Sequence, residues 1–293
     1  MQSSGEIKCG FCVAYDWELL ANSIPPIYKY CNTIVIAVDQ NCISWNGTSF
    51  QFDEDRFYLF IKSIDPENKI KIYREIFFIP DLSPAQNEIR QRNLLADYMG
   101  KGGWHLQIDS DEYILNPELL FNTIDSFRNS TGKVTIRCQW ITLFKYDSEG
   151  FFIVKNNPLH REFVAFATND PLYVYGRNNG CSNYYTNCLI LHQSWARSED
   201  EIVKKIDSWG HTKDVDFTSF KNGWLLLNIG NYKSYKNLHP LKPAMWQSLE
   251  RVEADSIQSL IKRSDWGRFK MASISLGLKN SKVLAKIRQT LNV

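Results

Sequence analysis

Short apolar runs alternate with helix-like segments along the first half of the chain, and this order constrains the fold more than any other feature. The runs that predict strands are residues 8–14, 33–39, 71–78 and 104–108. The clearest helical pattern covers residues 83–98, where Ser83 and Pro84 match an N-cap followed by proline at the first helical position. Strands that alternate with helices predict an α/β fold with a mostly parallel, right-handed sheet flanked by helices.

Two carboxylates stand at the end of the fourth run. Asp109 and Asp111 follow the alternating residues 104–108, and the carboxyl ends of strands are where open α/β sheets bind ligands. Residues two apart on an extended chain face the same way, so both carboxylates can point at one cation. Carboxylate oxygens suit Mg²⁺ or Mn²⁺, which neutralise a diphosphate. The alternative is a solvated turn with a helix cap.

Composition narrows the class of protein. The 293 residues fit one large α/β domain or two small ones, and a hydrophobic fraction of 44% is ample for a core. The net charge of +2, with no dense basic block before the C-terminus, gives no indication of nucleic-acid binding. No apolar leader and no run of 18 apolar residues occur, so we expect a cytoplasmic protein. The seven scattered cysteines predict reduced thiols.

The pattern changes after residue 149. Short strands are expected near residues 151–154, 162–167 and 172–175, and residues 189–191 predict a buried strand that ends at His192. Ser198 and Glu201 form a capping-box pattern that opens a helix. We expect the remaining residues, 231–293, to be a helical C-terminal region.

The order of these motifs resembles the family 2 glycosyltransferases, which have the GT-A fold, a Rossmann-like architecture. The resemblance covers about residues 8–145 and rests on the strand-turn-helix at residues 12–20, Asp39 at a strand end, Arg92-Asn93 on a helix, and the Asp-X-Asp motif at Asp109-Ser110-Asp111. It implies a nucleotide-sugar donor, a UDP-sugar first among them, and a Mn²⁺ or Mg²⁺ cofactor.

The resemblance also implies roles for individual residues. Tyr15 and Asp16, in the turn after the first strand, and Asp39 would hold the base and ribose. Arg92 would order the nucleotide or anchor its helix to Asp109. Asp109 would contact both the donor and the metal.

The second half looks like a subgroup with His-Gln-Ser-Trp-Ala-Arg-Ser at residues 192–198 and Trp-Gly-His at residues 209–211. The likeness implies that His192 joins Asp109 and Asp111 at the metal, with a core histidine as the alternative and His211 as the second candidate. It divides the chain into a nucleotide-sugar half, 1–145, an acceptor and metal half, 146–230, and the helical region.

Many inverting relatives carry a glutamate in the loop that corresponds to residues 176–183, and this chain has no carboxylate there. An inverting transfer needs a base near the acceptor hydroxyl. Glu162 and Asp170 are the nearest upstream carboxylates and the candidates for this role. The alternative for each is an exposed surface side chain without a catalytic role. Arg161 and Arg177 either assist the phosphates or lie on the solvated surface.

The expected activity is transfer of a sugar from a nucleoside-diphosphate donor to a saccharide or lipid-linked acceptor hydroxyl, in polysaccharide or surface-glycan synthesis. The alternatives are a non-catalytic saccharide- or nucleotide-sugar-binding protein and a sugar-1-phosphate nucleotidyltransferase, although the Gly-rich phosphate loop of the latter is missing. Apolar and cationic residues alternate at helical spacing over residues 279–291. They predict a final packed helix or, as the alternative, a peripheral anchor at the inner face of a membrane.

Overall fold

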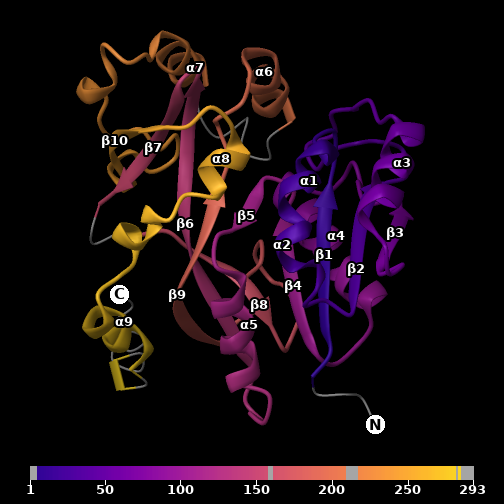
Figure 1. The fold of residues 1–293 in the computed structure, drawn as a ribbon. Helices are drawn as coiled ribbons and strands as arrows, with labels where there is room; N and C mark the ends of the chain where they lie inside the picture. The colour runs from indigo at the N-terminus through magenta and orange to yellow at the C-terminus, as the bar shows by residue number, and fades with distance from the viewer. Residues whose placement is uncertain (1–4, 158–160, 209–216, 282, 285–293) are drawn as a thin grey trace.

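The first half of the protein is a parallel sheet with helices on both faces (Figure 1). The computed structural model describes residues 5–157, 161–208, 217–281 and 283–284. The elements of this half are β1 (Ile7–Val13), α1 (Leu20–Ser23), α2 (Pro25–Tyr28), β2 (Thr33–Asp39), α3 (Glu54–Ile64), β3 (Ile70–Glu75), α4 (Pro84–Met99) and β4 (Trp104–Asp109). The strands lie in the order β4-β1-β2-β3, and each neighbouring pair is parallel. The four predicted strands and the helix after Ser83 are confirmed.

Alternate residues of β2 face two different hydrophobic cores. Ile34, Ile36 and Val38 pack in the core that also contains residues of α1, α2 and α3. Val35 and Ala37 pack with residues of α4 on the opposite face. Because successive side chains of a strand point to opposite faces, a strand covered on both sides must be apolar throughout.

The second half extends the same sheet, mainly with antiparallel strands. Its elements are β5 (Glu112–Ile114), α5 (Pro117–Ser126), β6 (Val134–Asp147), β7 (Gly150–Asn156), β8 (Phe163–Thr168), β9 (Ser182–His192), α6 (Glu199–Ser208), α7 (Phe217–Leu226), β10 (Trp246–Glu253), α8 (Ile257–Ile261) and α9 (Ser273–Asn280). The sheet order is β10-β7-β6-β8-β4-β1-β2-β3. β9 pairs with β6 and β5 off this path. The expected fold class, a mixed α/β sheet with a parallel core and flanking helices, is confirmed.

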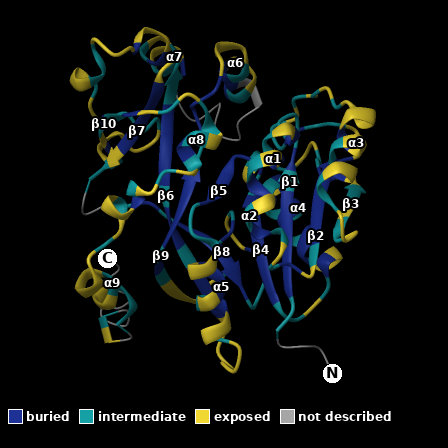
Figure 2. Cartoon of the chain, in the orientation of Figure 1, coloured by how far each residue is buried: buried dark blue, intermediate teal, exposed yellow. Residues whose placement is uncertain are grey.

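The direction of the strands brings distant parts of the chain to one edge. β8 is antiparallel to both β4 and β6, so β6 runs in the same direction as β4. β9 is parallel to β6. The carboxyl ends of β4 and β9 therefore lie toward the same edge of the sheet. Most residues of β4 and of the second half of β9 are buried (Figure 2).

Three expectations for the second half differ from the structure. The region expected to be helical contains the strand β10, because Trp246 and Leu249 pack in a core with residues of β7 while β10 pairs with that strand. Residues 172–175 form no strand, and only an isolated bridge joins Tyr175 to Asn178. The expected boundary near residue 145 falls inside β6. Most of the amphipathic stretch 279–291 lies outside the described residues.

No helix within the described ranges is both long enough and apolar enough to cross a bilayer.

Candidate functional site

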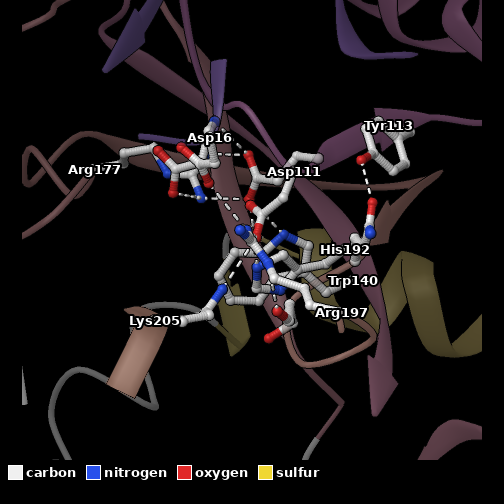
Figure 3. A network of polar contacts seen from close by, with 12 residues as sticks. Asp16, Asp111, Tyr113, Trp140, Arg177, His192, Arg197 and Lys205 are labelled. Atoms are coloured by element: carbon white, nitrogen blue, oxygen red, sulfur yellow. Dashed lines mark hydrogen bonds and ion pairs between the residues drawn. The ribbon is translucent and has the colours of Figure 1, made fainter. Parts of the chain in front are cut away.

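Asp111 lies where the two halves of the protein meet, and three nitrogen-bearing side chains surround it (Figure 3). Its Oδ2 accepts hydrogen bonds from Arg197 Nη2 at 2.7 Å and from Lys205 Nζ at 3.1 Å. Its Oδ1 lies 3.6 Å from His192 Nε2. His192 ends β9, Arg197 follows it and Lys205 lies on α6. The second half of the chain therefore supplies the partners of a carboxylate that belongs to the first.

The charge states of these groups follow from their surroundings. Burial alone would raise the pKa of the Asp111 carboxyl, but the three nitrogen groups hold that pKa far below its usual range. Burial alone would lower the pKa of Arg197, but Asp111 and Asp16 raise it above its usual value. Burial lowers the pKa of His192, so its imidazole is neutral at pH 7. An ionised carboxylate thus faces a neutral imidazole and two cations.

Arg197 also ties the turn after β1 to this cluster. Its Nη2 donates to Asp16 Oδ2 at 3.0 Å as well as to Asp111. The neighbouring Tyr15 is partly buried, and burial together with the nearby charge of Asp16 raises the pKa of its hydroxyl. The structure therefore brings Tyr15 and Asp16 to the same place as Asp111.

Asp109 is the more exposed of the two motif aspartates, with 32% of its side chain accessible. Its Oδ1 accepts a hydrogen bond from Arg92 Nη2 at 3.0 Å, and Arg92 Nε donates to Glu88 at 2.9 Å. Burial alone would raise the pKa of Asp109, but Arg92 and Arg177 lower it. Of the two roles expected for Arg92, the geometry gives the anchor between α4 and the end of β4.

Glu112 is a site residue that sequence reasoning missed, although it directly follows the Asp-X-Asp motif. It is fully buried and makes two hydrogen bonds with Arg177, each of 2.7 Å. Its Oε1 accepts from Trp140 Nε1 at 2.8 Å, and the Trp140 ring stacks on His192 with 4.6 Å between centroids. Arg177 therefore does not lie on the solvated surface, which was one of its two expected positions. Glu112 and Trp140 instead fix the position of His192 and of the chain after β4.

Asp39 accepts hydrogen bonds from the backbone of two loops. Its Oδ1 accepts from the backbone N–H groups of Asn41 and Ile43 at 2.9 and 3.1 Å, and its Oδ2 from those of Phe77 and Phe78 at 2.8 and 3.1 Å. A carboxylate has about four lone-pair positions. The four backbone donors use them all, and they join the loops after β2 and β3. The expected contact of Asp39 with a base remains untested.

Glu162 is buried, and Thr142 links it to the strand that carries His192. Its Oε2 accepts from Trp246 Nε1 at 2.9 Å and lies 3.4 Å from Thr142 Oγ1. Thr142 is the register partner of His192 across β6 and β9. Burial raises the pKa of the Glu162 carboxyl. One of the two expected base candidates therefore borders the site.

Asp170 is not brought to the cluster. It follows β8, whose last residue, Thr168, pairs with His105 near the start of β4, so Asp170 lies toward the opposite edge of the sheet from Asp109. Its carboxylate forms an ion pair with Lys133 at 2.9 Å. Arg161 does not contact the Asp111 cluster either, and its guanidinium donates to the Phe269 carbonyl at 2.7 Å. His211 lies outside the described residues.

Two side chains at Asp111 are of the types that can bind a divalent cation. Among the residues that the structure describes, no three or more His, Cys, Asp or Glu side chains gather at metal-binding geometry. Asp111 Oδ1 and His192 Nε2 nevertheless face each other, and the buried His192 Nδ1 has no hydrogen-bond partner among the described groups. A carboxylate or two, completed by substrate phosphates, is how Mg²⁺ is commonly bound.

Sequence reasoning did not identify Arg197 and Lys205 as the cations at this site. Arg197 belongs to the motif at residues 192–198, but nothing in its spacing indicated a carboxylate partner. Lys205 is one of two adjacent lysines on a charged helix, and no sequence signal separates it from Lys204. Their contacts with Asp111 span 86 and 94 residues, so only the fold identifies them.

No protein-family model and no curated protein matches the chain. Solved structures align with it only weakly. A crystal structure of S. aureus TarS 1-349 is 13% identical with a TM-score of 0.33, over 46% of this chain and 36% of that chain. Another crystal structure of TarS 1-349 contains UDP-GlcNAc.

A crystal structure of GalNAc-T7 with UDP, GalNAc and Mn²⁺ is 13% identical with a TM-score of 0.38, over 76% of this chain and 51% of that chain. Mannose-6-phosphate isomerase from Helicobacter pylori is 15% identical with a TM-score of 0.31, over 54% and 60% of the two chains. The aligned part is thus less than two thirds of each of these proteins. At this level of likeness the alignments carry no argument, and the function is inferred from the geometry of the site itself.

Proposed function

We propose that the protein is a glycosyltransferase that moves a sugar from a nucleoside-diphosphate donor to a hydroxyl group of a saccharide or lipid-linked acceptor. The observation that carries this proposal is the convergence of carboxylates from the first half with Arg197 and Lys205 from the second. Buried charges brought together in this way are poor stabilisers of a fold. Perturbed ionisable groups clustered at a strand edge are typical of functional sites. Carboxylates for a cation beside cations for phosphates suit a nucleotide-sugar donor.

The proposed cofactor is Mn²⁺ or Mg²⁺. Asp111 Oδ1 and His192 Nε2 would hold it, with Asp109 as the further carboxylate on the same strand end. Such an ion, when bound, acts as a Lewis acid that neutralises the leaving diphosphate. Trp140, stacked on the imidazole at 4.6 Å between centroids, fixes the orientation of His192.

Tyr15 and Asp16 are the proposed contacts for the nucleoside, and a UDP-sugar is the first donor to test. Both residues lie in the turn after β1, and Asp16 is linked to Asp111 through Arg197. Asp39 holds the loops after β2 and β3 together through four backbone hydrogen bonds. We therefore assign its contribution to the shape of the nucleoside site, because no lone pair is left for the base.

Glu162 is the proposed base of an inverting displacement. The acceptor oxygen attacks the anomeric carbon while the bond from that carbon to the phosphate oxygen breaks, and the hydroxyl proton passes to the Glu162 carboxylate. This assignment is supported by the 3.4 Å separation from Thr142, the register partner of His192. Burial raises the pKa of the Glu162 carboxyl, which makes its carboxylate a stronger base than an exposed glutamate.

Thermal unfolding with a panel of nucleotide sugars, each with and without MnCl₂, tests the proposal. A cognate donor should raise the midpoint in a metal-dependent way. Slow release of the nucleoside diphosphate should accompany this shift in wild type and be lost in Glu162→Gln. Asp170→Asn is the matched control and should behave as wild type. If no nucleotide sugar shifts the midpoint, the proposal is wrong.

Binding without release would instead favour a non-catalytic nucleotide-sugar-binding protein. This second candidate is favoured by the loop at residues 176–183, which carries no carboxylate that could act as a base. Release in the wild type that depends on Glu162 would exclude it.

A further inference from the structure

Arg197 carries a hydrogen-bond donor that no described residue uses. Its Nη2 donates to Asp111 and Asp16, and its Nε donates to the Ser194 carbonyl at 3.1 Å. Its Nη1 is buried without a partner in the described part of the chain, and only 1% of the side chain is exposed. A buried donor without an acceptor is costly and rare in native proteins. The residue that holds Asp111 therefore has one donor still to be satisfied.

Lys205 provides further donors at the same position. Its Nζ lies 3.1 Å from Asp111 Oδ2, and this is its one hydrogen bond to the described residues. An ammonium group has three donors. The side chain is 15% exposed, and its Nζ lies 5.6 Å from the centroid of the Trp195 ring, so it borders both the cluster and solvent. A flexible four-carbon stem lets the ammonium turn from Asp111 to a ligand without moving α6.

The charge count at Asp111 favours a polyanion as that ligand. Arg197 and Lys205 form ion pairs with Asp16 and Asp111, so two cations balance two carboxylates (Figure 3). A divalent cation at Asp111 and His192 would therefore leave the cluster with a surplus of two positive charges. A diphosphate supplies the opposite charge, together with oxygen atoms that accept from guanidinium and ammonium groups.

We propose that Arg197 and Lys205 form the subsite for the phosphate groups of the donor. Arg197 donates through Nη1 while its Nη2 keeps the bonds to Asp16 and Asp111. Lys205 turns its ammonium from Asp111 Oδ2 to a phosphate oxygen. This inference rests on the proposed function and identifies residues for the leaving group that the sequence did not reveal.

Calorimetry with inorganic pyrophosphate and MgCl₂ tests the subsite without any assumption about the nucleobase. Lys205→Met should weaken pyrophosphate binding about 10-fold to 100-fold, as expected for one lost charge-assisted hydrogen bond. Lys205→Arg keeps the charge and should restore most of the affinity. Arg197→Lys should also weaken binding, because it removes Nη1. Lys204→Met, on the exposed neighbouring position of α6, is the matched control and should bind as wild type.

Thermal unfolding of each variant without ligand separates loss of binding from loss of fold. If Arg197→Lys does not fold, Lys205→Met decides the question, because its side chain is not enclosed. Equal pyrophosphate affinity in wild type and Lys205→Met would overturn the inference. In that case the proposed function would still be supported if a nucleotide sugar stabilised wild type in a metal-dependent way. Wild type that binds neither pyrophosphate nor any nucleotide sugar would overturn both.

Discussion

The end of β2 and the loop after β4 each carry a buried aspartate, but the two carboxylates have different kinds of partner. Asp39 accepts four hydrogen bonds from backbone N–H groups. Asp111 is held by the side chains of Arg197 and Lys205, with His192 nearby. Backbone donors cannot leave without disrupting their loops, whereas side-chain cations can turn to another anion. The first carboxylate is thus suited to holding the structure and the second to exchanging partners with a ligand.

The largest expected effect is on the stability of Asp39→Ala. Removing this buried carboxylate leaves four backbone donors, of which that of Phe77 is buried, without their acceptor, so the free energy of unfolding should fall by about 3 kcal/mol. Urea denaturation followed by tryptophan fluorescence measures it. Asp170→Ala removes a carboxylate that contacts the exposed Lys133 and the thiol of Cys181, and it should change the unfolding free energy by less than about 1 kcal/mol. If Asp39→Ala were as stable as wild type, Asp39 would not have the structural role that distinguishes it here from Asp111.

The next effect is on ligand binding in Asp111→Asn. This variant should lose about 100-fold in affinity for Mn²⁺ with the cognate nucleotide sugar, since it replaces a charged carboxylate ligand by a neutral amide. Its stability should fall less than that of Asp39→Ala, because Arg197 keeps its bond to Asp16 and Lys205 can reach solvent. Calorimetry and urea denaturation of the same samples provide both values. Unchanged affinity would show that Asp111 holds no metal.

His105 is a third kind of buried ionisable group, since neither of its ring nitrogens has a partner among the described residues. Burial, with a smaller effect from Lys8, lowers its pKa to about 4 from the usual 6.5. The unfolded chain therefore takes up this proton first as pH falls, and stability is lost progressively between pH 6.5 and pH 4. The loss from this group at pH 5 should be about 2 kcal/mol.

His105→Leu should remove that part of the acid sensitivity. The measurement is the difference in unfolding free energy between pH 7 and pH 5, compared for wild type and variant. If the variant lost as much stability as wild type between pH 7 and pH 5, a group other than His105 would be responsible for the loss.

The smallest effect concerns competition between cations at Asp111. Lys205→Met removes a positive charge 3.1 Å from Asp111 Oδ2, so the affinity for Mn²⁺ alone should rise about threefold at low salt. This is the opposite sign to the effect expected on pyrophosphate. Electron paramagnetic resonance of free Mn²⁺ in a titration measures it, with Lys204→Met as the control. A fall in Mn²⁺ affinity would indicate that Lys205 supports the site only structurally.

The elements that local patterns determine could be predicted from the sequence. The run at residues 33–39 is β2 and the helix after Ser83 is α4, whose N-cap makes both hydrogen bonds of a capping box. A strand apolar on both faces and a capped helix carry their signals within a few residues. The position of Asp109 and Asp111 at the edge of the sheet followed from the same local reasoning.

The partners of those aspartates could not be predicted, because they depend on contacts between distant residues. Lys205 and Lys204 are equivalent in the sequence, and only the docking of α6 directs one of them to Asp111. The strand β10 was missed because it pairs with β7, whose residues lie about 90 to 100 positions earlier in the chain, so no local pattern indicates the pairing. Asp39 matched a functional pattern, yet its backbone partners Phe77 and Phe78 come from a different loop.

The parallel pairing of β6 with β9 has a consequence for the order in which the protein folds. The two strands are separated in the chain by β7 and β8, and their register brings His192 beside Thr142 only after both have formed. Contacts between distant residues form slowly, because the chain entropy of closing the loop is lost before the contacts are gained. The first half can therefore acquire its helices and parallel strands before His192 and the cations arrive at Asp111. We expect the capacity to bind a ligand to appear late in refolding, after most of the helical circular dichroism has returned.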